Sequence, residues 1–506
     1  MKAPAWFSHL LPTARRLRHA VRRFEGAVFN RLTHSWMMAE RSINTELRRD
    51  LDALRRRSRD LSKNEPMAAK FLKMVRKNVA GPKGFNFQAR VTDPDGKPDN
   101  LANNAIEAAW YDWCRPVNCD IAGRLSFTGM VQGLAVAIAR DGEALVRMID
   151  GAPNPYGFAL QWLDIERLDT TFHREARDGV NQVIMGVEMD ANGRPVAYHL
   201  ATAEIGRDPT GRSLQRFPAD NLLHLYMTDD PEQVRGIPWM HASMIRIHHL
   251  KGFQEAAIIA ARIGASKMGF FVSKDNDTPP VDPRAIADGE DEAGIPFTEA
   301  EPGQFGMAPP GYEFQAFNPD YPHGNYDPFV KAAKRDIGSG FDVAYHALGN
   351  DLEGVNFSSI RAGVLDERDS WMLIQNWLIE HCLDIIYLRW LDSALLMRAI
   401  VLPNGSPLPA SKRPKFAAHE FQGRRWPLVD PLKDTMSSVL AIKNRLADPY
   451  TIAAQQGVDL DDVLDGIARF EASAKRKNVA LYIDDAAAME AAAAIVAADK
   501  PANAAP

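Results

Sequence analysis

A group of carboxylates that follows a predicted strand is the feature of this sequence most similar to a chemical site. Asp164, Glu166 and Asp169 stand within a few positions of one another. Carboxylates grouped in this way could bind a divalent metal ion and support hydrolysis of a phosphodiester. The same residues could equally be solvent-exposed acids at the end of a strand. Both interpretations, a metal site and an ordinary surface, stay open here.

Motifs for other kinds of catalysis are absent from the sequence. It contains no G-x-x-x-x-G-K-[ST], no G-x-S-x-G and no G-x-G-x-x-G after a strand, which argues against an ATPase, a serine hydrolase and a dinucleotide enzyme. His248-His249 is a poor metal site because adjacent helical residues face different directions, and His419-Glu420 lacks the second histidine of H-E-x-x-H. We predict no catalytic residue, no metal site and no cofactor.

A polar loop at residues 348–356 precedes a long helical pattern and points to assembly rather than to catalysis. Asn350, Asp351, Glu353 and Asn356 are its polar side chains. The loop leads directly into a long helical pattern that Ser358 or Ser359 could cap, with no proline from position 360 to 392. Such a helix would extend roughly 50 Å, which is typical of a component of a large assembly. The apolar stripe expected on one of its faces comprises Ile360, Val364, Trp371, Ile374, Leu378, Cys382 and Ile385.

A second helical pattern, over residues 241–266, carries a face of small residues. Gly252, Ala256, Ala260 and Gly264 recur at four-residue steps. Small residues on a helical face permit close approach of another helix. The partner could be an internal helix of a monomer, or the same helix of a neighbouring subunit around a ring axis.

Charge is distributed unevenly along the chain. The 506 residues carry a net charge of -5, yet residues 1–80 hold 19 Lys and Arg against 7 Asp and Glu. A basic arm on an acidic body predicts an anionic partner for the arm. The alternative is that Arg55, Arg56, Arg57 and Arg59 form the solvated face of an ordinary helix.

Length and composition are those of a globular protein with about two to four domains. The 3 cysteines cannot form a disulfide framework, and we interpret Cys114, Cys119 and Cys382 as reduced core residues. No apolar run approaches the roughly 18 residues of a membrane span, and the basic N-terminus lacks the features of a signal peptide. We expect a protein with no membrane association.

The remaining patterns outline the organisation of the chain. Alternating strands and turns over residues 80–230 predict an α+β domain with an antiparallel sheet, including one strand over 184–189. An acidic, Pro- and Gly-rich excursion follows at 268–325. Asp327-Pro328 then opens a helix that carries Lys331, Lys334 and Arg335. Asp430, Asp448 and Asp459 each start a helix of a small bundle, and the end of the chain is Ala-rich.

Taken together, these segments resemble the lambda family of phage portal proteins. Each motif is weak alone, and their order and spacing over residues 45–475 make the resemblance specific. The motifs are Arg57-Ser58-Arg59-Asp60-Leu61, Cys119-Asp120-Ile121-Ala122-Gly123, Asp141-Gly142-Glu143-Ala144-Leu145, Gln233-Val234-Arg235-Gly236-Ile237-Pro238, Asn350-Asp351, Asn356-Phe357-Ser358-Ser359-Ile360-Arg361 and Trp426-Pro427-Leu428-Val429-Asp430-Pro431-Leu432-Lys433.

The resemblance implies a non-enzymatic homo-oligomeric ring of about twelve subunits at one vertex of a phage capsid. Double-stranded DNA would enter through its channel during packaging by terminase and leave through it during ejection. The implied partners are the terminase large subunit, a head-tail adaptor and the major capsid or scaffold protein. The protein would reside in the virion and, during assembly, in the host cytoplasm, in an active phage or a resident prophage. Another phage head protein, such as a minor capsid component, is the first alternative, and a metal-dependent nuclease is the second.

The fold that the resemblance implies is α+β, with an antiparallel-sheet wing, a helical stem, a small clip insertion, a long wing helix and a helical C-terminal crown. The expected segments are the arm at 1–44, wing at 45–240, stem helix at 241–267, clip at 268–325, second stem helix at 326–347, tunnel loop at 348–357, long helix and wing return at 358–429, crown at 430–480 and flexible tail at 481–506.

The resemblance also assigns roles to residues. Asn350, Asp351, Glu353 and Asn356 would belong to a tunnel loop that narrows the DNA channel. Lys331, Lys334 and Arg335 would form a basic ring in the stem, or would pair with acids of the next subunit. The small residues Gly252, Ala256, Ala260 and Gly264 would pack stem helices of neighbouring subunits together.

Overall fold

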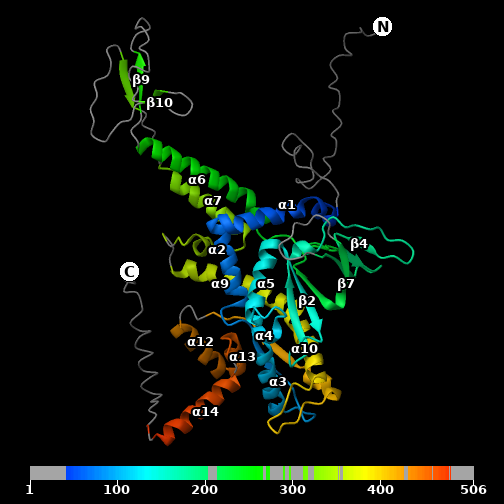
Figure 1. Cartoon of the computed structure of the whole chain (residues 1–506). Coiled ribbons are helices and arrows are strands. Elements are labelled where there is room, and N and C mark those ends of the chain that lie inside the picture. Colours follow the sequence, from blue (N-terminus) through cyan, green and yellow to red (C-terminus); the bar gives the residue numbers. More distant parts are fainter. Residues whose placement is uncertain are drawn as a thin grey trace, which may run out of the picture.

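The chain forms a central body from which the helices of residues 244–265 and 326–340 project on one side, with the helices of residues 431–476 on the other (Figure 1). The computed structural model describes residues 42–202, 213–265, 269–273, 289–290, 296–297, 312–316, 324–351, 353, 357–426, 431–458, 460–477 and 479. Most of the basic arm, the Ala-rich tail and Asn356 lie outside these residues. The mixed helix and sheet content agrees with the α+β prediction. No helix among the described residues has the length and apolar character needed to cross a bilayer.

Two helices and a π-helical turn lead into the central body. Pro66 opens α2 directly after Glu65, as its position predicts, because proline fits the first turn of a helix. The buried faces of the two helices include Leu47, Leu51, Phe71 and Val75, which recur at helical spacing. The elements are α1 (Ile43–Asn64), α2 (Pro66–Val75) and the turn Arg76–Ala80.

The two larger antiparallel sheets of the central body have the strand orders β3-β2-β8 and β4-β5-β6-β7. The strand predicted over 184–189 is wrong: the left-handed residues Met185 and Gly186 turn the chain there, so two short strands form a hairpin. The sequence prediction also missed β7. The strands are β2 (Glu143–Asp150), β3 (Phe158–Leu163), β4 (Gln182–Ile184), β5 (Val187–Met189), β6 (Pro195–Ala201), β7 (Leu214–Pro218) and β8 (Leu222–Tyr226), with short 3-10 turns at Ile165–Arg167 and Ala219–Asn221.

An aromatic cluster lies at the centre of the body, where distant parts of the chain meet. Strand β1 (Asn86–Ala89) pairs with β13 (His419–Gln422), which brings Phe87 opposite Phe421. Trp110 and Trp390 pack edge to face with ring centroids 5.1 Å apart. The helices around the cluster are α3 (Asn100–Trp113), α4 (Pro116–Cys119), α5 (Phe127–Asp141) and α11 (Arg413–Phe416), which follows a 3-10 turn at Ala410–Lys412.

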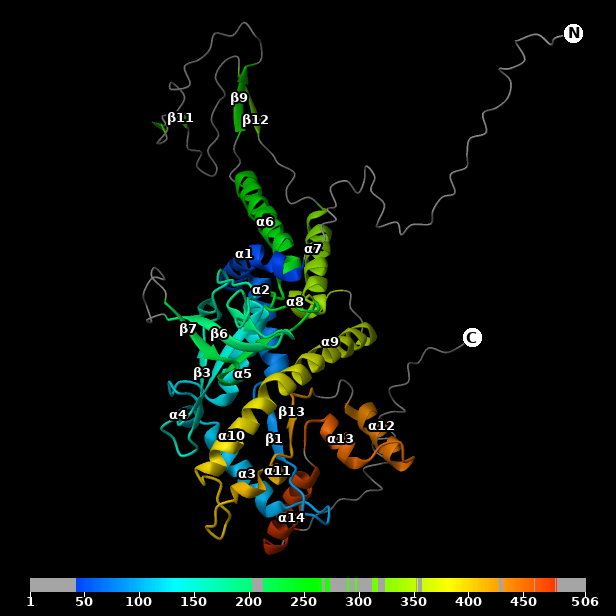
Figure 2. The same ribbon diagram turned by 90° about the vertical axis from the view of Figure 1, so that its right-hand side faces the viewer.

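The predicted long helix is present as one continuous helical segment with a π-turn inside it. It comprises α9 (Phe357–Leu378), the π-turn Ile379–Leu383 and α10 (Asp384–Leu396). A π-turn adds one residue to the helical repeat, so it shifts the buried face by one position. Cys382 is buried as predicted, but Ile385 is exposed and Ile386 takes the core position instead. In Figure 2 the first part of α9 extends away from the body.

The projecting helices α6 (Met244–Ala265) and α7 (Tyr326–Gly340) run antiparallel to each other, and a 3-10 turn at His241–Ser243 precedes α6. Phe253 stacks on Tyr326 with ring centroids 5.7 Å apart, and Arg246 forms an ion pair with Asp336. Helix α7 begins at Tyr326, so the prediction that Asp327 caps it is wrong. At the far end lie the antiparallel pairs β9 (Gly269–Ser273) with β12 (Tyr312–Ala316) and β10 (Gly289–Glu290) with β11 (Pro296–Phe297) (Figures 1 and 2).

The C-terminal helices are α12 (Pro431–Lys443), α13 (Pro449–Gln455) and α14 (Leu460–Arg476). Asp448 caps α13 as predicted, since its side chain accepts a hydrogen bond from the backbone N–H of Thr451 at 3.0 Å. Ala474 is the single buried residue among the described residues of this region.

Candidate functional site

The predicted polar loop begins at the base of the helix pair. After α7 ends at Gly340, the chain turns through the left-handed residue Asp342 and forms the short helix α8 (Tyr345–Gly349). Asn350 follows in the left-handed conformation, so the chain changes direction again. We call Asn350, Asp351 and Glu353 the loop base.

Asp351 is held by the helix that precedes it. Its Oδ2 accepts a hydrogen bond from the hydroxyl of Tyr345 at 2.6 Å, and its Oδ1 accepts one from the backbone N–H of Glu353 at 3.0 Å. The Tyr345 hydroxyl therefore lowers the pKa of Asp351. Partial burial, followed by the bond to Asp351, raises the pKa of Tyr345. Asp351 is thus a carboxylate, and Tyr345 its donor, at neutral pH.

Lys331 is surrounded by acids of its own subunit. Its Nζ lies 2.8 Å from Glu353 Oε2, 3.0 Å from Asp327 Oδ2 and 3.9 Å from Asp351 Oδ2. These contacts, the bond to Glu353 first, raise the pKa of Lys331. The structure therefore joins the predicted loop acids to one of the predicted stem cations, which sequence reasoning had treated separately. The positive charge of Lys331 is compensated within the subunit.

The other two predicted stem cations, Lys334 and Arg335, lie in different surroundings. The guanidinium of Arg335 lies over the ring of Tyr345, 5.4 Å from its centroid. Lys334 instead lines a cavity of about 490 Å³ between α2, α6 and α8. The cavity is basic, because it is also lined by Lys70, Lys73 and Lys251 and by the single acid Glu65, which pairs with Lys251 at 2.9 Å.

Sequence reasoning missed two residues that position the loop base, Tyr345 and Lys70. Lys70 lies in α2, 280 positions earlier in the chain, and donates a hydrogen bond of 2.7 Å to Asn350 Oδ1. No short-range signal connects residues so far apart. The loop base is consequently fixed from three sides, by α2, α7 and α8.

The small-residue face of α6 is open in the single chain. Gly252 and Ala256 are exposed, and a Cβ placed on Gly252 would meet no atom within 4 Å. Ala260 is half-buried, and Gly264 lies in the last turn of α6. The alternative of an internal helix packed on this face of a monomer is therefore wrong for Gly252 and Ala256.

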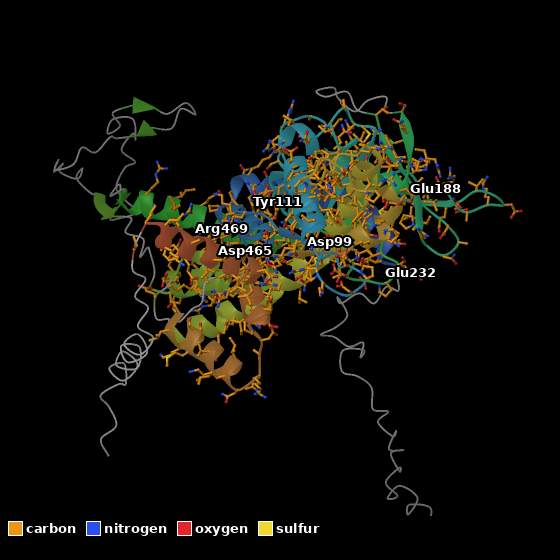
Figure 3. All side chains as sticks on the ribbon, turned by 90° about the horizontal axis from the view of Figure 1, so that it is seen from below. Asp99, Tyr111, Glu188, Glu232, Asp465 and Arg469 are labelled. Carbon is orange, nitrogen blue, oxygen red and sulfur yellow. The ribbon has the colours of Figure 1, made fainter. Side chains whose placement is uncertain are left out.

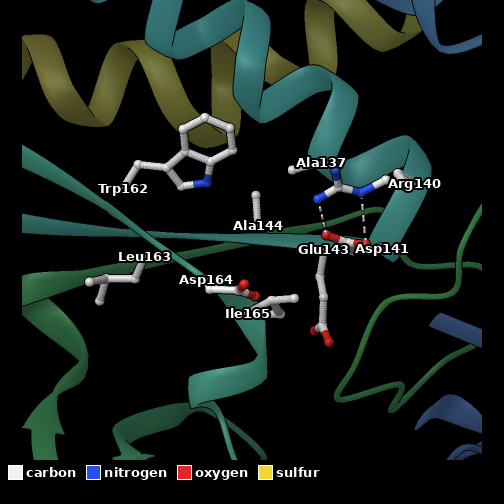
Figure 4. Close-up of a pocket in the computed structure, with 9 residues that line it drawn as sticks. All are labelled: Ala137, Arg140, Asp141, Glu143, Ala144, Trp162, Leu163, Asp164 and Ile165. Atoms are coloured by element: carbon white, nitrogen blue, oxygen red, sulfur yellow. Dashed lines mark hydrogen bonds and ion pairs between the residues drawn. The ribbon is translucent and has the colours of Figure 1, made fainter. Parts of the chain in front are cut away.

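Of the carboxylates considered for a nuclease, Asp164 and Glu166 are engaged in ion pairs, and Asp169 accepts hydrogen bonds from the backbone N–H and hydroxyl of Thr171. Arg59 of α1 lies 2.8 Å from each of Asp141, Asp164 and Glu166. Figure 4 shows Asp164 beside the pocket where Arg140 pairs with Asp141 at 2.7 Å. Within the described part of the chain, no group of three or more His, Cys, Asp or Glu residues is arranged to hold a metal ion. The geometry thus favours the structural explanation of these acids.

A buried charged cluster beneath these residues was not predicted. Glu143 is fully buried, and its Oε1 lies 2.7 Å from Arg235 Nη2 and close to Arg55 Nη2. His224 Nε2 lies 2.5 Å from the other carboxylate oxygen. Burial disfavours the Glu143 carboxylate, but the attraction of Arg235 and the bond with His224 outweigh it, so its pKa is lowered. Both sequence interpretations of Arg55, as an anion-binding or a solvated residue, are wrong.

Gly142 and Gly236 lie beside this charged cluster, where the backbone segments approach too closely to leave room for a Cβ. Gly142 is left-handed, and a Cβ on it would lie 2.5 Å from the carbonyl carbon of Ile237 and 2.7 Å from that of Gly236. The close approach carries Arg235 toward Glu143. The motifs Asp141-Gly142-Glu143 and Arg235-Gly236 thus form one structural unit, which their spacing along the chain does not reveal.

Comparison with known proteins decides the family. Residues 29–375 match the family described as phage portal protein, lambda family. The chain belongs to this family. A probable portal protein of Halomonas phage phiHAP-1 is 34% identical over 453 residues, which cover 88% of this chain and 86% of the relative. Portal protein B of Escherichia phage lambda is 20% identical over 475 residues, which cover 87% of each chain.

Solved structures of gene transfer agent particles also match the chain. The neck of the empty particle, computed with C6 symmetry, aligns with a TM-score of 0.42 and 14% identity over 81% of this chain and 94% of the other. The virion of the native particle aligns with a TM-score of 0.44 and 14% identity over 84% of this chain and 98% of the other.

Membership of the portal family confirms two predictions made from the sequence. The resemblance to the lambda family is correct, and the protein is a structural component rather than an enzyme. The roles of individual residues in the portal depend on the geometry of the loop base and of the helix pair.

Proposed function

We propose that copies of this portal protein form a ring of about twelve subunits at one capsid vertex. Double-stranded DNA passes through the channel of the ring during packaging and ejection. Membership of the lambda portal family supports the assembly. The open small-residue face of α6 supports it from the geometry, because an exposed row of Gly and Ala allows another helix to approach closely.

The parts of the molecule then take the roles that the family architecture names. The central body is the wing, α6 and α7 are the stem, and the β9 to β12 strands belong to the clip. The C-terminal helices form the crown, and the loop base begins the tunnel loop. In this arrangement the ring meets the terminase large subunit, the head-tail adaptor and the major capsid or scaffold protein.

The observation that carries the proposal is the charge of the loop base. Asp351 and Glu353 are acids at the start of the loop, and they compensate the charge of Lys331 together with Asp327. Contacts between cations and phosphates give DNA strong, salt-dependent affinity. A constriction whose acids compensate Lys331 offers that cation to phosphates only weakly, so DNA passes the acids without being held by them.

Charge reversal at Glu353 tests this assignment. We expect Glu353→Lys to assemble normally and to package DNA more slowly, by about tenfold, because each ring gains a cluster of free cations that bind phosphates. Packaging would be measured as protected DNA per head in a reconstituted reaction. Glu353→Gln is the matched control, since it also loses the ion pair with Lys331 but adds no positive charge, and we expect it to package nearly as the native protein does.

Two results would overturn the proposal at different points. Native packaging rates with Glu353→Lys would show that the loop does not line the passage. Electron microscopy and mass measurement of the purified chain, alone and co-expressed with head proteins, test the ring itself. A monomer or dimer in both preparations would contradict the assembly.

A further inference from the structure

A cavity of about 490 Å³ lies at the base of the helix pair, where α6 and α7 meet α2 and α8. Its volume falls in the range of roughly 300–1,000 Å³ that small-molecule sites have in proteins. Apolar side chains form part of its wall, and those that are buried are Ile247, Leu250, Ile337 and Leu348. An apolar wall lowers the local dielectric constant, so charges beside it act more strongly than they would in bulk water. The charged side chains of the lining therefore decide what the cavity can bind.

The charged side chains of the lining are four lysines and one glutamate. The glutamate, Glu65, pairs with Lys251 at 2.9 Å. The other three lysines pair with no carboxylate among the residues that the structure describes; they are Lys70, Lys73 and Lys334. The cavity thus has three positive charges for which its own lining supplies no anion.

The hydrogen bond of Lys70 does not change this balance. Its Nζ donates to the amide oxygen of Asn350 at 2.7 Å, and an amide carries no net charge. Lys70 and Lys73 are three positions apart on α2, so their ammonium groups lie on one face of the helix. Like charges in this arrangement destabilise a helix, and a bound anion would remove that cost.

Lysines that the fold uses for its own structure have carboxylate partners. Lys415 lies 2.7 Å from Asp93 and 2.6 Å from Asp99, which is labelled in the view from below in Figure 3. Lys331, one turn before Lys334 on α7, contacts three acids. The cavity lysines receive no such partner within the described residues, which indicates that a ligand compensates them.

The type of cation indicates which anion fits. Lysine ammonium groups are point charges with donors in several directions, whereas arginine has a flat fork that matches a carboxylate. The lining of the cavity includes lysines and no arginine. Ammonium groups on different sides of one space suit the tetrahedral oxygens of phosphate groups. A single phosphate carries about two negative charges at neutral pH, so a chain of phosphates balances three cations better.

We propose that this cavity binds a polyphosphate chain, either free or as part of a nucleotide. The ammonium groups of Lys70 and Lys73 on α2 and of Lys334 on α7 contact its oxygens. Because Lys70 also binds Asn350, the ligand lies beside the loop base. The inference goes beyond the proposed ring and does not depend on it.

Calorimetric titration of the full-length protein with sodium tripolyphosphate tests the proposal. We expect one site per protomer, with an affinity at least about tenfold higher than that for inorganic phosphate, because more negative charge meets the same three cations. ATP is titrated at the same salt concentration to separate the two sources of the chain. Binding of ATP at least about tenfold tighter than tripolyphosphate would identify a nucleotide as the ligand, and no tighter binding would identify the free chain.

Chemical labelling locates the bound anion. Lysines of the full-length protein would be acylated with and without tripolyphosphate, and the modified positions identified by mass spectrometry. We expect the ligand to cause a loss of labelling at Lys70, Lys73 and Lys334. Lys97 is the internal reference, because its side chain is 81% exposed on the surface, and its labelling should not change.

Substitution of the cations provides the third measurement. The double variant Lys73→Gln and Lys334→Gln should weaken tripolyphosphate binding at least about tenfold, because two of three cations are removed. Its circular dichroism should remain native, since neither lysine has a carboxylate partner within the described residues. The single variant Lys73→Gln, at an exposed position of α2, gives the same test if the double variant does not fold. Lys97→Gln is the matched control and should bind as the native protein does.

Four results would overturn the inference. Tripolyphosphate that does not bind, or that binds the double variant with native affinity, would show that the cavity lysines form no anion site. Protection of these lysines by a short DNA duplex but not by tripolyphosphate would assign them to the DNA backbone. Their protection in rings without any added anion would show that a neighbouring subunit covers the cavity.

Discussion

At the scale of single residues, the cluster around Glu143 joins three segments of the central body. Arg55 comes from α1, Glu143 from β2 and Arg235 from the segment after β8, and all three are buried. Water does not screen these charges, so each depends on the others for compensation. The cluster thus fixes how α1, which connects to the N-terminal arm, lies on the sheet.

The substitution Glu143→Gln should destabilise the protomer by about 3–5 kcal/mol, because it keeps the shape of the side chain but leaves two buried guanidinium groups without their carboxylate. Urea unfolding followed by circular dichroism would measure the change. Glu166→Gln is the control: this carboxylate is 49% exposed in its pair with Arg59, so we expect a loss of at most about 1 kcal/mol. Equal losses for both variants would contradict the role of burial.

At the scale of elements, the loop base is a short segment held between helices rather than a free connection. The hydroxyl of Tyr345 binds Asp351 at 2.6 Å, and Lys331 on α7 binds Glu353 at 2.8 Å. The two contacts thus attach the loop base to α8 and α7, the two helices that precede it in the chain. A shift of α7 relative to α8 would therefore move the acids of the loop with it, which couples the proposed stem to the proposed channel constriction.

Removing one hydroxyl should release part of this segment. In Tyr345→Phe we expect the described amides at 349–351 and 353 to exchange up to about tenfold faster, since one hydrogen bond contributes about 0.5–1.5 kcal/mol. The aromatic ring of the variant would still lie under Arg335, so the cation–π contact is retained. Exchange in the β2-β3 hairpin should not change in the same sample. Unaltered exchange at the loop base would show that the Tyr345–Asp351 bond does not hold it.

At the scale of the whole molecule, the single chain has surfaces that one chain does not complete. The helix pair exposes Ile245, Ile258, Ile259 and Phe329 besides its small-residue face, and the C-terminal helices expose large apolar side chains as well. The central body, by contrast, has a continuous buried core. Folding of the body and assembly of the ring are thus expected to be separable steps.

Substitution of Gly252 separates these steps experimentally. Gly252→Leu should leave the protomer at least as stable, because helical glycine costs about 0.5–1 kcal/mol relative to alanine and the space beside it is open. The bulky side chain should lower the ring fraction at least about tenfold, by blocking close approach of a neighbouring helix. Gly252→Ala is the control and should assemble. Native mass spectrometry would measure both, and full assembly of Gly252→Leu would contradict the packing role.

Features that depend on neighbouring residues could be predicted from the sequence. The break at Pro66, the cap at Asp448, the antiparallel character of the sheets and the existence of the long helix were all predictable, because capping, proline geometry and periodicity act over a few residues. The order and spacing of the motifs were sufficient for the family as well.

Contacts between residues far apart in the chain became apparent only from the folded structure. The π-turn that replaces Ile385 with Ile386 in the core, the burial of Arg55 against Glu143 and the hydrogen bond from Lys70 to Asn350 have no signature in local sequence. Each depends on packing or on charge compensation between segments that come together only when the chain folds. The acids of the loop base could therefore be predicted from the sequence, but their contacts with Lys331 and Tyr345 could not.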